Sequence, residues 1–365
     1  MKYYIIAGEA SGDLYGSKLI DEIISIDKKA DIRFWGGDKM IKSGGYNVKH
    51  IKELAYMGFY EVLKNIKTIL KNIHFCKNDI RIFNPDKIIY IDYPGFNLRI
   101  CKWAKKNGYR NYYYISPQIW AWKENRIKSI KNNIDKLYVI FPFEKDYYQN
   151  KHNMESEFYG HPLIEHIDDF NYSDEFLLKN KINKEKEIVS LLPGSRAHEI
   201  NSMLPIFLTL KNHFQNYEFI VAGVKNVNES VYLPALDLNV KVVFSQTYDL
   251  LSHSKLAIVT SGTASLECAL FNVPQIVCYK TSGISYFIGK TFVNISFISI
   301  VNIILKKGVV DELIQYNFTE EKLLNVFTDL TSGNRIPNML SEYSKIYSLL
   351  SLKETSKKIA TSIIN

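Results

Sequence analysis

The sequence predicts an α/β protein built from two doubly wound parallel sheets that face each other across a cleft. Apolar segments typical of buried strands alternate with segments typical of helices, and this alternation occurs twice along the chain. Two apolar segments of the second half end in glycine-containing loops that open a helix, as phosphate-binding loops do. The length of 365 residues exceeds what one hydrophobic core usually supports, which favours two domains.

The first domain is predicted to span residues 1–167. An apolar strand at Tyr3–Ala7 leads through Gly8–Asp13 into a helix at Leu14–Ile26. The elements that follow are a strand at Ile32–Trp35, a helix from about Gly58 to Phe83, a strand at Lys87–Ile91, a helix near Leu98–Lys106, and strands at Asn111–Ile115 and Lys136–Ile140. Short connections between strands and helices are typical of parallel sheets wrapped by helices.

The second domain is predicted to span residues 187–337. Its strands are expected at Ile188–Leu192, Phe219–Ala222, Lys241–Phe244, Ala257–Thr260 and Gln275–Tyr279. The charged, asparagine-rich stretch Asp168–Lys186 is interpreted as the linker between the domains. Residues 338–365 are predicted to form a C-terminal helical segment that packs back across the junction.

Composition limits the class of partner. Hydrophobic residues make up 46% and charged residues 23% of the chain, as in a globular protein. The net charge of +8 favours an anionic partner, and nucleic acid is set aside because no binding motif or dense basic block accompanies the charge. The four cysteines show no C-x-x-C spacing and no nearby histidine, so we interpret them as free thiols in a reducing compartment.

Two segments bear on localisation. The apolar N-terminal run is too short for a signal peptide, and the apolar stretch Ile284–Leu305 is interrupted by glycine, lysine and asparagine, which argues against a membrane span. The helix expected at Gly58–Phe83 interleaves large apolar residues with lysines, a pattern that suits an anionic membrane surface. The alternative is an amphipathic helix packed on the core. From these features we expect a cytosolic protein that contacts a membrane surface.

The loop Pro193–Arg196 is the strongest functional signal. Gly194 and Ser195 present backbone N–H groups at the start of a helix, and Arg196 adds a planar cationic fork for the same anion. A second loop of this type follows the strand that ends at Thr260 and contains Ser261, Gly262 and Thr263. Together the two loops suggest a binding site for a nucleotide diphosphate, in which Glu267 reaches the ribose hydroxyls. The alternatives are an ordinary strand-to-helix turn and a first-turn glutamate favoured by the helix dipole.

Three loops of the first domain follow strands and should lie at the carboxyl edge of its sheet, where ligands of such folds bind. Asp92 closely follows an apolar strand, and its carboxylate could accept a proton from a hydroxyl nucleophile; the alternative is a turn or helix N-cap residue. Asp13 could equally cap the helix from Leu14. The chain has no Asp-x-Asp motif and no histidine–carboxylate cluster, so we expect neither a metal nor another cofactor, with leaving-group charge stabilised by Arg196 and helix N-termini.

In chain order, eight segments resemble the lipid-A-disaccharide synthase family: Gly8–Asp13, Met57–Leu63, Ile91–Asn97, Ser116–Trp122, Phe141–Glu144, Gly160–Pro162, Leu192–Arg196 and Ser261–Glu267. The resemblance runs from about residue 5 to about residue 325. It implies an inverting, metal-independent glycosyltransferase of the two-Rossmann-domain B type. Such an enzyme joins UDP-2,3-diacylglucosamine to 2,3-diacylglucosamine 1-phosphate in lipid A biosynthesis and releases UDP and a β-1,6-linked disaccharide 1-phosphate.

The resemblance also implies roles for single residues. Asp92 is similar to the family's general base, and Arg196, Glu267 and Asn302 are similar to its UDP contacts, although the family commonly has Leu-Pro-Asn where this chain has Ile300-Val301-Asn302. Tyr248 is a candidate for packing against uracil, or else a core aromatic residue. Five residues are assigned to the acceptor side of the cleft: Glu9, Ser11, Gly12, Asp13 and Trp120.

Two other functions stay open. A UDP-sugar 2-epimerase of similar architecture would need the loops of the second domain but not the Trp-Ala-Trp segment at 120–122. A non-catalytic nucleotide-sugar binding module would keep the loops and could dispense with Asp92. An NAD-dependent dehydrogenase is set aside, because no G-x-G-x-x-G motif follows the first strand.

Overall fold

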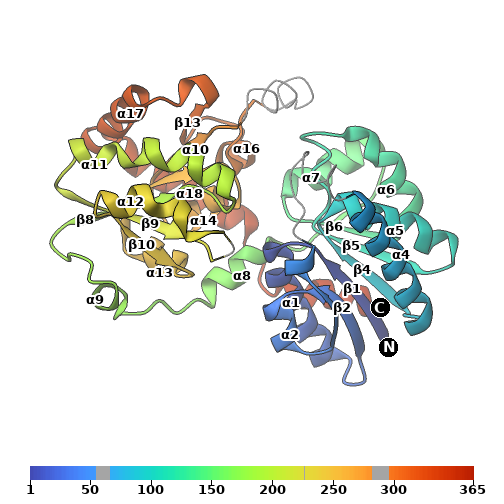
Figure 1. Ribbon diagram of the computed structural model, residues 1–365. Coiled ribbons are helices and arrows are strands. Elements are labelled where there is room, and N and C mark those ends of the chain that lie inside the picture. Colours follow the sequence, from blue (N-terminus) through green and yellow to red (C-terminus); the bar gives the residue numbers. More distant parts are fainter. Residues whose placement is uncertain (55–65, 226, 282–295) are drawn as a thin grey trace. The chain divides into compact units, whose positions relative to one another are not determined.

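The computed structural model describes residues 1–54, 66–225, 227–281 and 296–365 (Figure 1). The chain forms two compact units, one of Met1–Glu165 with Leu350–Asn365 and one of His166–Leu349. Each unit is built on one parallel sheet, so the predicted α/β class is confirmed. Residues 168–186, interpreted above as a linker, belong to the second unit, where Phe176 is buried. The C-terminal segment 338–365 is divided between the units.

The first unit has a seven-stranded sheet in the order β3-β2-β1-β4-β5-β6-β7. The strands are β1 Lys2–Ala7, β2 Asp31–Gly36, β3 Tyr46–His50, β4 Lys87–Ile91, β5 Arg110–Tyr114, β6 Lys136–Val139 and β7 Glu157–Phe158. Ile5 of β1 lies opposite Phe34 of β2 and Ile89 of β4, and all pairs are parallel. The edge strands β3 and β7 were not predicted. They are short or polar, and edge strands need not be apolar on both faces.

Helices cover both faces of this sheet. They are α1 Ala10–Ile26, α2 Asp38–Ser43, α4 Ile66–Phe83, α5 Pro94–Lys106, α6 Ile127–Asn133, α7 Pro142–Asp146 and α19 Thr355–Ile364, with α8 Pro162–Asp168 leading into the second unit. Short turns are η1 Ile51–Glu53, η2 Glu124–Arg126 and the π-helical η3 Tyr147–Lys151. Figure 1 shows α4, α5 and α6 on one face and α1 and α2 on the other. The predicted helix from Gly58 is described only from Ile66.

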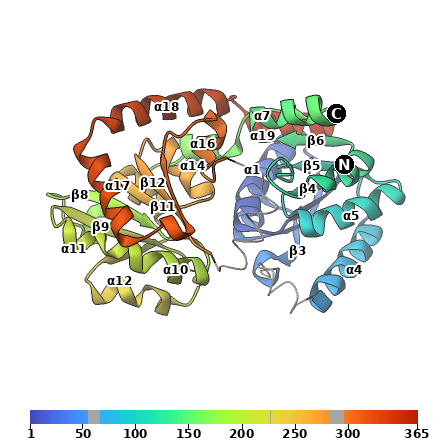
Figure 2. The same cartoon turned by 90° about the horizontal axis from the view of Figure 1, so that it is seen from above.

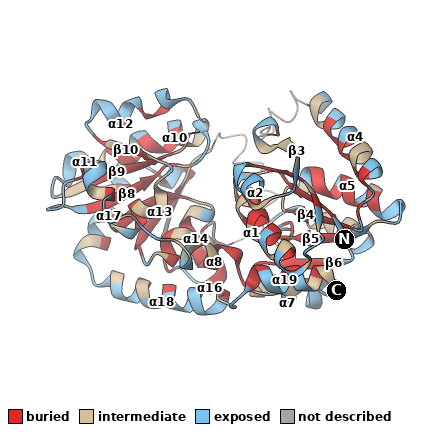
Figure 3. Cartoon of the chain, turned by 90° about the horizontal axis from the view of Figure 1, so that it is seen from below, coloured by how far each residue is buried: buried red, intermediate tan, exposed pale blue. Residues whose placement is uncertain are grey.

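Tyrosines and tryptophans contribute much of the first unit's core. The indole of Trp35 donates to the Tyr4 hydroxyl at 2.8 Å, and that hydroxyl donates to Asp79 of α4 at 2.9 Å. The buried Tyr90 hydroxyl donates to Asn111 at 2.9 Å. A buried hydroxyl without a partner would be destabilising, and these bonds remove that cost while the rings fill the core. In Figure 3 the strands are accordingly buried and the helices expose their outer faces.

The second unit has a six-stranded sheet in the order β10-β9-β8-β11-β12-β13. The strands are β8 Glu187–Leu192, β9 Tyr217–Gly223, β10 Lys241–Phe244, β11 Ser254–Thr260, β12 Gln275–Tyr279 and β13 Asp311–Ile314. The five predicted strands are confirmed, and the acidic edge strand β13 is additional. Leu192 of β8 lies opposite Val259 of β11, so the loops that follow these two strands are neighbours.

The helices of the second unit lie on both faces of its sheet. They are α9 Phe176–Lys179, α10 Ala197–Leu208, α11 Leu210–His213, α12 Leu233–Asp237, α13 Thr247–Ser252, α14 Thr263–Leu270, α16 Ile300–Leu305, α17 Glu320–Ser332 and α18 Arg335–Leu350, with the turns η4 Glu229–Tyr232 and η5 Gln315–Asn317. Figure 2 shows α10 and α12 on one face and α14, α16 and α18 on the other.

Two further expectations concern cysteines and the apolar stretch near residue 300. Cys76, Cys101, Cys268 and Cys278 are free and buried, which confirms that they form no disulfide framework.

Of the stretch Ile284–Leu305, residues up to 295 lie outside the described part, and the rest ends in the short helix α16 with Val301 and Ile304 buried. Within the described ranges, no helix combines the length and apolar character that crossing a membrane requires.

Candidate active site

Asp92 lies directly after β4, at the carboxyl edge of the first unit's sheet. Its backbone and that of Tyr93 are left-handed, with φ of 45° and 49°, a conformation that costs energy for residues other than glycine. Three hydrogen bonds hold this turn. The Asp92 amide donates to Tyr114 O at 3.0 Å, and the Asp92 carbonyl accepts from the Tyr113 hydroxyl and the Asn97 amide, each at 2.7 Å.

The environment of the Asp92 carboxyl favours its neutral form. Burial, and secondly the negative charge of Glu9, raise the pKa of Asp92 to about 7, while the Tyr93 amide and the positive charge of Arg126 act in the opposite direction. The N-cap residue of α5 is Tyr93, so the alternative role of Asp92 as that N-cap is not what the structure shows. A carboxyl with a pKa near neutrality at the edge of such a sheet is suited to proton transfer.

The loop Gly8–Asp13 contains one residue with a clear structural role. The helix begins at Ala10 rather than Leu14, and Asp13 is buried in its first turn. The Asp13 carboxylate accepts from the backbone amides of Gly37, Lys39 and Met40 at 2.7–3.1 Å. It therefore caps α2, not its own helix, and these bonds do not point to an acceptor contact.

The other residues of this loop lie closer to the ligand edge. Glu9 is the partly exposed N-cap residue of α1, near enough to Asp92 to raise its pKa. Ser11 is partly exposed. Gly12 is buried, and a Cβ there would lie 3.2 Å from the Cβ of Ala7, so this glycine lets the helix approach β1 closely.

Trp120 is fixed by a buried carboxylate that the sequence did not single out. The Trp120 indole donates to Glu144 at 3.1 Å, and Glu144 also accepts from the amides of Ile140 and Phe141 at 3.0 Å. The Trp120 ring meets Phe143 edge-on at 5.0 Å. Burial raises the pKa of Glu144 to about 7, against the effect of its three donors. Glu144 thus ties the loop after β5 to the end of β6. In the sequence it was noted only as the last residue of Phe141–Glu144, one of the segments that resemble the family.

In the second unit, the loop Pro193–Arg196 is shaped by Glu199. The Glu199 carboxylate accepts from the amides of Ser195 and Arg196 at 3.0 and 3.2 Å and pairs with the Arg196 guanidinium at 3.2 Å. Gly194 has a φ of 118°, and a Cβ there would lie 2.6 Å from a Glu199 oxygen, so the loop needs glycine at this position. Ser195 and Arg196 are exposed at the start of α10.

The neighbouring loop after β11 brings two predicted residues together. The hydroxyl of Tyr248, in α13, donates to the Glu267 carboxylate at 2.8 Å. The Tyr248 ring packs against Phe170 and Phe271 at 5.3 and 5.1 Å, and all three rings are partly exposed. Ser261 donates to Ile298 O at 2.8 Å. Gly262 and Thr263 begin α14, and a Cβ at Gly262 would meet no atom within 4 Å among the described residues.

Asn302 lies in the core rather than at an exposed face. Its amide donates to Val310 O at 2.9 Å and to Glu312 at 2.8 Å, and its oxygen accepts from the amides of Val309 and Val310 at 2.8 and 3.0 Å. Both ends of the side chain are therefore used to hold the turn before β13. A role as a UDP contact, implied by the resemblance, finds no support in this arrangement.

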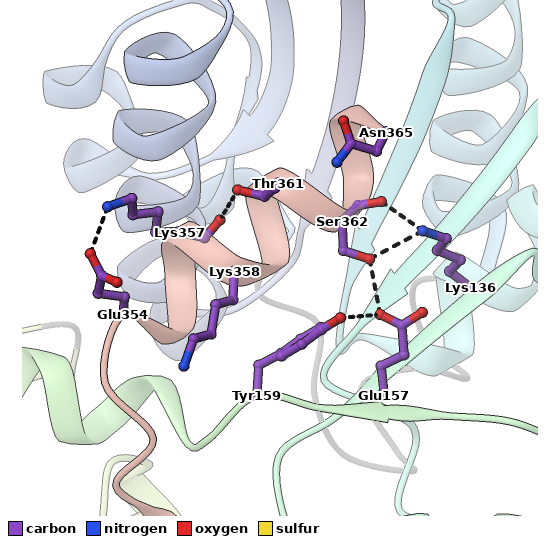
Figure 4. Close-up of a pocket in the computed structure, with 9 residues that line it drawn as sticks. All are labelled: Lys136, Glu157, Tyr159, Glu354, Lys357, Lys358, Thr361, Ser362 and Asn365. Atoms are coloured by element: carbon purple, nitrogen blue, oxygen red, sulfur yellow. Dashed lines mark hydrogen bonds and ion pairs between the residues drawn. The ribbon is translucent and has the colours of Figure 1, made fainter.

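A cavity of about 480 Å³ lies at the opposite edge of the first unit's sheet (Figure 4). Lys136 and Glu157, the first residues of β6 and β7, line it together with residues of α19. Lys136 donates to the backbone and hydroxyl oxygens of Ser362 at 2.8 and 3.1 Å, and Ser362 and Tyr159 donate to Glu157. These polar groups tie α19 to the sheet, far along the strands from Asp92.

Histidine, cysteine and acidic side chains do not gather into a metal-binding group of three or more anywhere in the described ranges. The cations placed at the two carboxyl edges are Arg196, which pairs with Glu199, and Arg126, which lies close enough to Asp92 to lower its pKa. Arg126 was not predicted as a site residue. Its signal was only a basic residue in the segment after the Trp-Ala-Trp motif.

Comparison with known proteins gives a match along nearly the whole chain. Residues 3–363 match the family model described as lipid-A-disaccharide synthetase. The chain is 34% identical over 367 residues to the lipid-A-disaccharide synthase of Syntrophus aciditrophicus, covering 98% of this chain and 95% of the relative. It is 35% identical over 359 residues to lipid-A-disaccharide synthase 1 of Legionella pneumophila strain Paris, covering 95% and 92%.

Solved structures with the same fold are more distant in sequence. A UDP-GlcNAc 2-epimerase from Neisseria meningitidis bound to UDP-GlcNAc aligns with a TM-score of 0.69 at 14% identity, covering 100% of both chains. The glycosyltransferase of kitacinnamycin aligns with a TM-score of 0.66 at 12% identity, covering 100% of this chain and 98% of the other. At such identities the likeness is one of architecture, which epimerases and glycosyltransferases share.

Proposed function

This chain belongs to the lipid-A-disaccharide synthetase family, and from that premise we propose how its residues divide the reaction. The protein is a glycosyltransferase of lipid A biosynthesis that uses a UDP-sugar and a lipid A precursor. In our proposal the donor is UDP-2,3-diacylglucosamine and the acceptor is 2,3-diacylglucosamine 1-phosphate. Asp92 is the general base, and the loops Pro193–Arg196 and Ser261–Thr263 hold the diphosphate.

The proposed step is a single displacement. Asp92 takes the proton of the acceptor 6-hydroxyl as its oxygen forms a bond to the donor's anomeric carbon. The bond from that carbon to the UDP oxygen breaks, and UDP leaves with the electron pair. Attack opposite to the leaving group inverts the configuration and gives the β-1,6 linkage. Arg196 and the loop amides stabilise the charge that develops on the diphosphate.

The observation that carries the assignment is the position and environment of Asp92. Its carboxyl follows β4 at the ligand edge of the sheet, on a turn fixed by Tyr113 and Asn97. A pKa of about 7 lets the same group be ionised before the step and hold the proton after it near neutral pH. The positive fork of Arg196 at the start of α10 supports the assignment of the donor diphosphate to the second unit.

A pH profile of product formation tests the assignment. With both proposed substrates, mass spectrometry should detect the disaccharide 1-phosphate. Its kcat/KM should rise with pH through a midpoint near 7, because Asp92 must be ionised to accept a proton and its ionised fraction grows as pH passes its pKa. Glu9→Gln should move this midpoint to lower pH, because the negative charge of Glu9 raises the pKa of Asp92.

Glu185→Gln, an exposed change in the second unit, is the control and should leave the midpoint in place. The charge of Glu9 is a cause of the Asp92 shift, whereas the Glu144 shift arises from burial and from Asp92. If the midpoint of the pH profile is the same in wild type and in Glu9→Gln, Asp92 is therefore not the titrating base. Absence of disaccharide at every pH would contradict the substrate assignment itself.

We further propose that helix α4 contacts the membrane that carries the acceptor. Its inner face, with Ile73, Cys76 and Ile80, is buried in the core, as the core-packed alternative predicts. Its outer face nevertheless exposes Leu70 and Ile82, at 58% and 78%. Exposed apolar side chains beside basic ones suit the cytoplasmic surface of an anionic membrane.

The same face continues onto neighbouring elements. Phe75 of α4 is 46% exposed and lies against Trp35, with the Lys49 ammonium 5.9 Å from its ring centre. Tyr46 of β3 is 63% exposed and lies 5.4 Å from the Arg33 guanidinium. Each aromatic ring is therefore paired with a cation, an arrangement that suits the interface between lipid headgroups and acyl chains. Phe59 and Lys64, which belong to the helix expected at Gly58–Phe83, lie outside the described residues.

Replacing Leu70, Phe75 and Ile82 by serine should reduce co-sedimentation with anionic liposomes, because the apolar area available for insertion is lost. Activity on detergent-solubilised acceptor should fall less than activity on vesicles. Replacing Lys71 and Arg81 by glutamine should weaken binding to anionic liposomes by about 1 kcal/mol per charge. This difference from wild type should disappear at high salt, which screens the electrostatic attraction. The control is Leu178→Ser with Leu236→Ser, two exposed leucines of the second unit. Unchanged vesicle binding in a folded triple variant would exclude this face.

A further inference from the structure

Trp122, the last residue of the Trp-Ala-Trp motif, and the two cations Lys123 and Arg126 that follow it form a cluster. The Lys123 ammonium lies 4.2 Å and the Arg126 guanidinium 5.5 Å from the Trp122 ring centre. Trp122 is 44% exposed, Lys123 is exposed and Arg126 is half-buried. The ring orders both long side chains, which lowers the entropy that they would lose on binding a ligand.

Among the described residues, no carboxylate forms an ion pair with either cation of this cluster. Within the described part of the chain, neither Lys123 nor Arg126 forms an ion pair or a side-chain hydrogen bond, and the adjacent Glu124 is paired with Lys151 at 2.7 Å and His152 at 3.1 Å. Burial and the charge of Arg99 lower the pKa of Arg126, and burial and Arg126 lower that of Lys123. Holding a half-buried guanidinium without a partner is unfavourable, and an anion would relieve this.

The backbone adds a second sign of a built site. Lys123 has a φ of 55°, in the left-handed region that non-glycine residues rarely occupy. Such strain is concentrated at sites where a side chain must be held in one place. Here it precedes the turn η2, which carries Arg126.

The cluster lies beside Asp92 but is not its ion-pair partner. Asp92 and Arg126 are close enough that each shifts the pKa of the other, yet the two do not come within salt-bridge distance. β4, which ends at Asp92, pairs with β5, from which the Trp-Ala-Trp segment follows. A ligand that contacts Asp92 with one end could therefore reach the cluster with the other.

We propose that Arg126 and Lys123 form the subsite for the phosphate monoester of the acceptor, a step that rests on the proposed function. One pyranose ring separates the acceptor's 6-hydroxyl from its 1-phosphate, so the two ends of the sugar would be held by Asp92 and by this cluster. The planar fork of Arg126 suits two phosphate oxygens, and Lys123 supplies a second positive charge for a group that carries close to two negative ones. The subsite would select phosphorylated acceptors and fix which hydroxyl meets Asp92.

The test compares two acceptors in nonionic detergent micelles: 2,3-diacylglucosamine 1-phosphate and its neutral 1-O-methyl analogue. Wild type should prefer the phosphate in kcat/KM. Arg126→Met should reduce that preference about 10- to 100-fold, as expected for a lost charge-assisted bidentate contact. Lys123→Met, at an exposed position, should reduce it a few-fold. The KM for the UDP-sugar should stay unchanged, and Arg126→Lys should restore part of the preference.

Lys128→Met, an exposed lysine of α6, is the matched control and should keep the full preference. Assays at pH 9 keep Asp92 ionised in every variant, and circular dichroism checks folding. An equal loss with both acceptors would mean that Arg126 acts through Asp92, and a loss seen only on anionic vesicles would mean that the cluster binds the membrane. Either result, or an unchanged preference, overturns the subsite. Wild type that glycosylates neither acceptor would instead refute the proposed function.

Discussion

Asp92→Asn is expected to lower kcat by about 10²- to 10⁴-fold while UDP affinity stays unchanged. Asparagine keeps the size and the backbone turn of residue 92, but its amide cannot accept the proton of the acceptor hydroxyl. The diphosphate is assigned to loops of the other unit, so donor binding should not depend on this carboxyl. Steady-state kinetics with both substrates and calorimetric titration with UDP measure the two quantities.

Loss of folding should not explain the result. The folded protein raises the pKa of Asp92 to about 7, so its ionised form is disfavoured relative to the unfolded chain. This contribution to stability is present at low pH and is lost as pH rises toward 7, and a neutral asparagine removes the dependence. The variant should therefore melt at the same temperature as wild type or higher at pH 8. Asp21→Asn, an exposed change on α1, is the control. Near-normal turnover in Asp92→Asn would remove Asp92 from the mechanism.

The strands that carry the site could be predicted because they are buried on both faces. Continuous apolar runs such as Ile88–Ile91 and Ala257–Val259 leave little choice of secondary structure, and the loops after them must lie at the carboxyl edge. The strands that were missed, β3, β7 and β13, lie at sheet edges and include charged residues. Their pairing is decided by neighbours far along the chain, which a local pattern does not report.

Roles of single polar residues were harder to predict than the loops that hold them. Asp13 and Asn302 each lie near the expected ligand edge in sequence. Asp13 nevertheless accepts from the backbone amides of Gly37 and Met40. Asn302 binds backbone groups of Val309 and Val310 and the Glu312 carboxylate. Glu144 shows the reverse case, since the resemblance included its segment but did not predict its buried contact to Trp120. Whether a carboxylate stabilises the fold or orders a site residue becomes clear only from the groups that lie near it in the structure.

Arg196→Ala is expected to weaken UDP binding by about 10- to 100-fold, corresponding to about 1.5–3 kcal/mol for a charge-assisted contact, and to slow turnover as well. The guanidinium is exposed at the start of α10, where it and the amides of Ser195 and Arg196 already hold one anionic group, the Glu199 carboxylate. Arg196→Lys should recover only part of the affinity, because an ammonium group does not reproduce the planar fork. Calorimetric titration with UDP, and with uridine as a ligand lacking the diphosphate, separates this contact from binding of the base.

The matched control is Arg335→Ala, which removes an exposed arginine of the same unit that pairs with Asp311 at 2.8 Å. It should leave UDP affinity unchanged. Uridine affinity should be the same in wild type and in Arg196→Ala, because uridine offers no anion to the loop. Treatment of wild type with EDTA should have little effect if Arg196 and the loop amides carry the leaving-group charge. Strict dependence on a divalent cation, or a uridine affinity that falls together with that of UDP, would show that Arg196 does not act on the diphosphate.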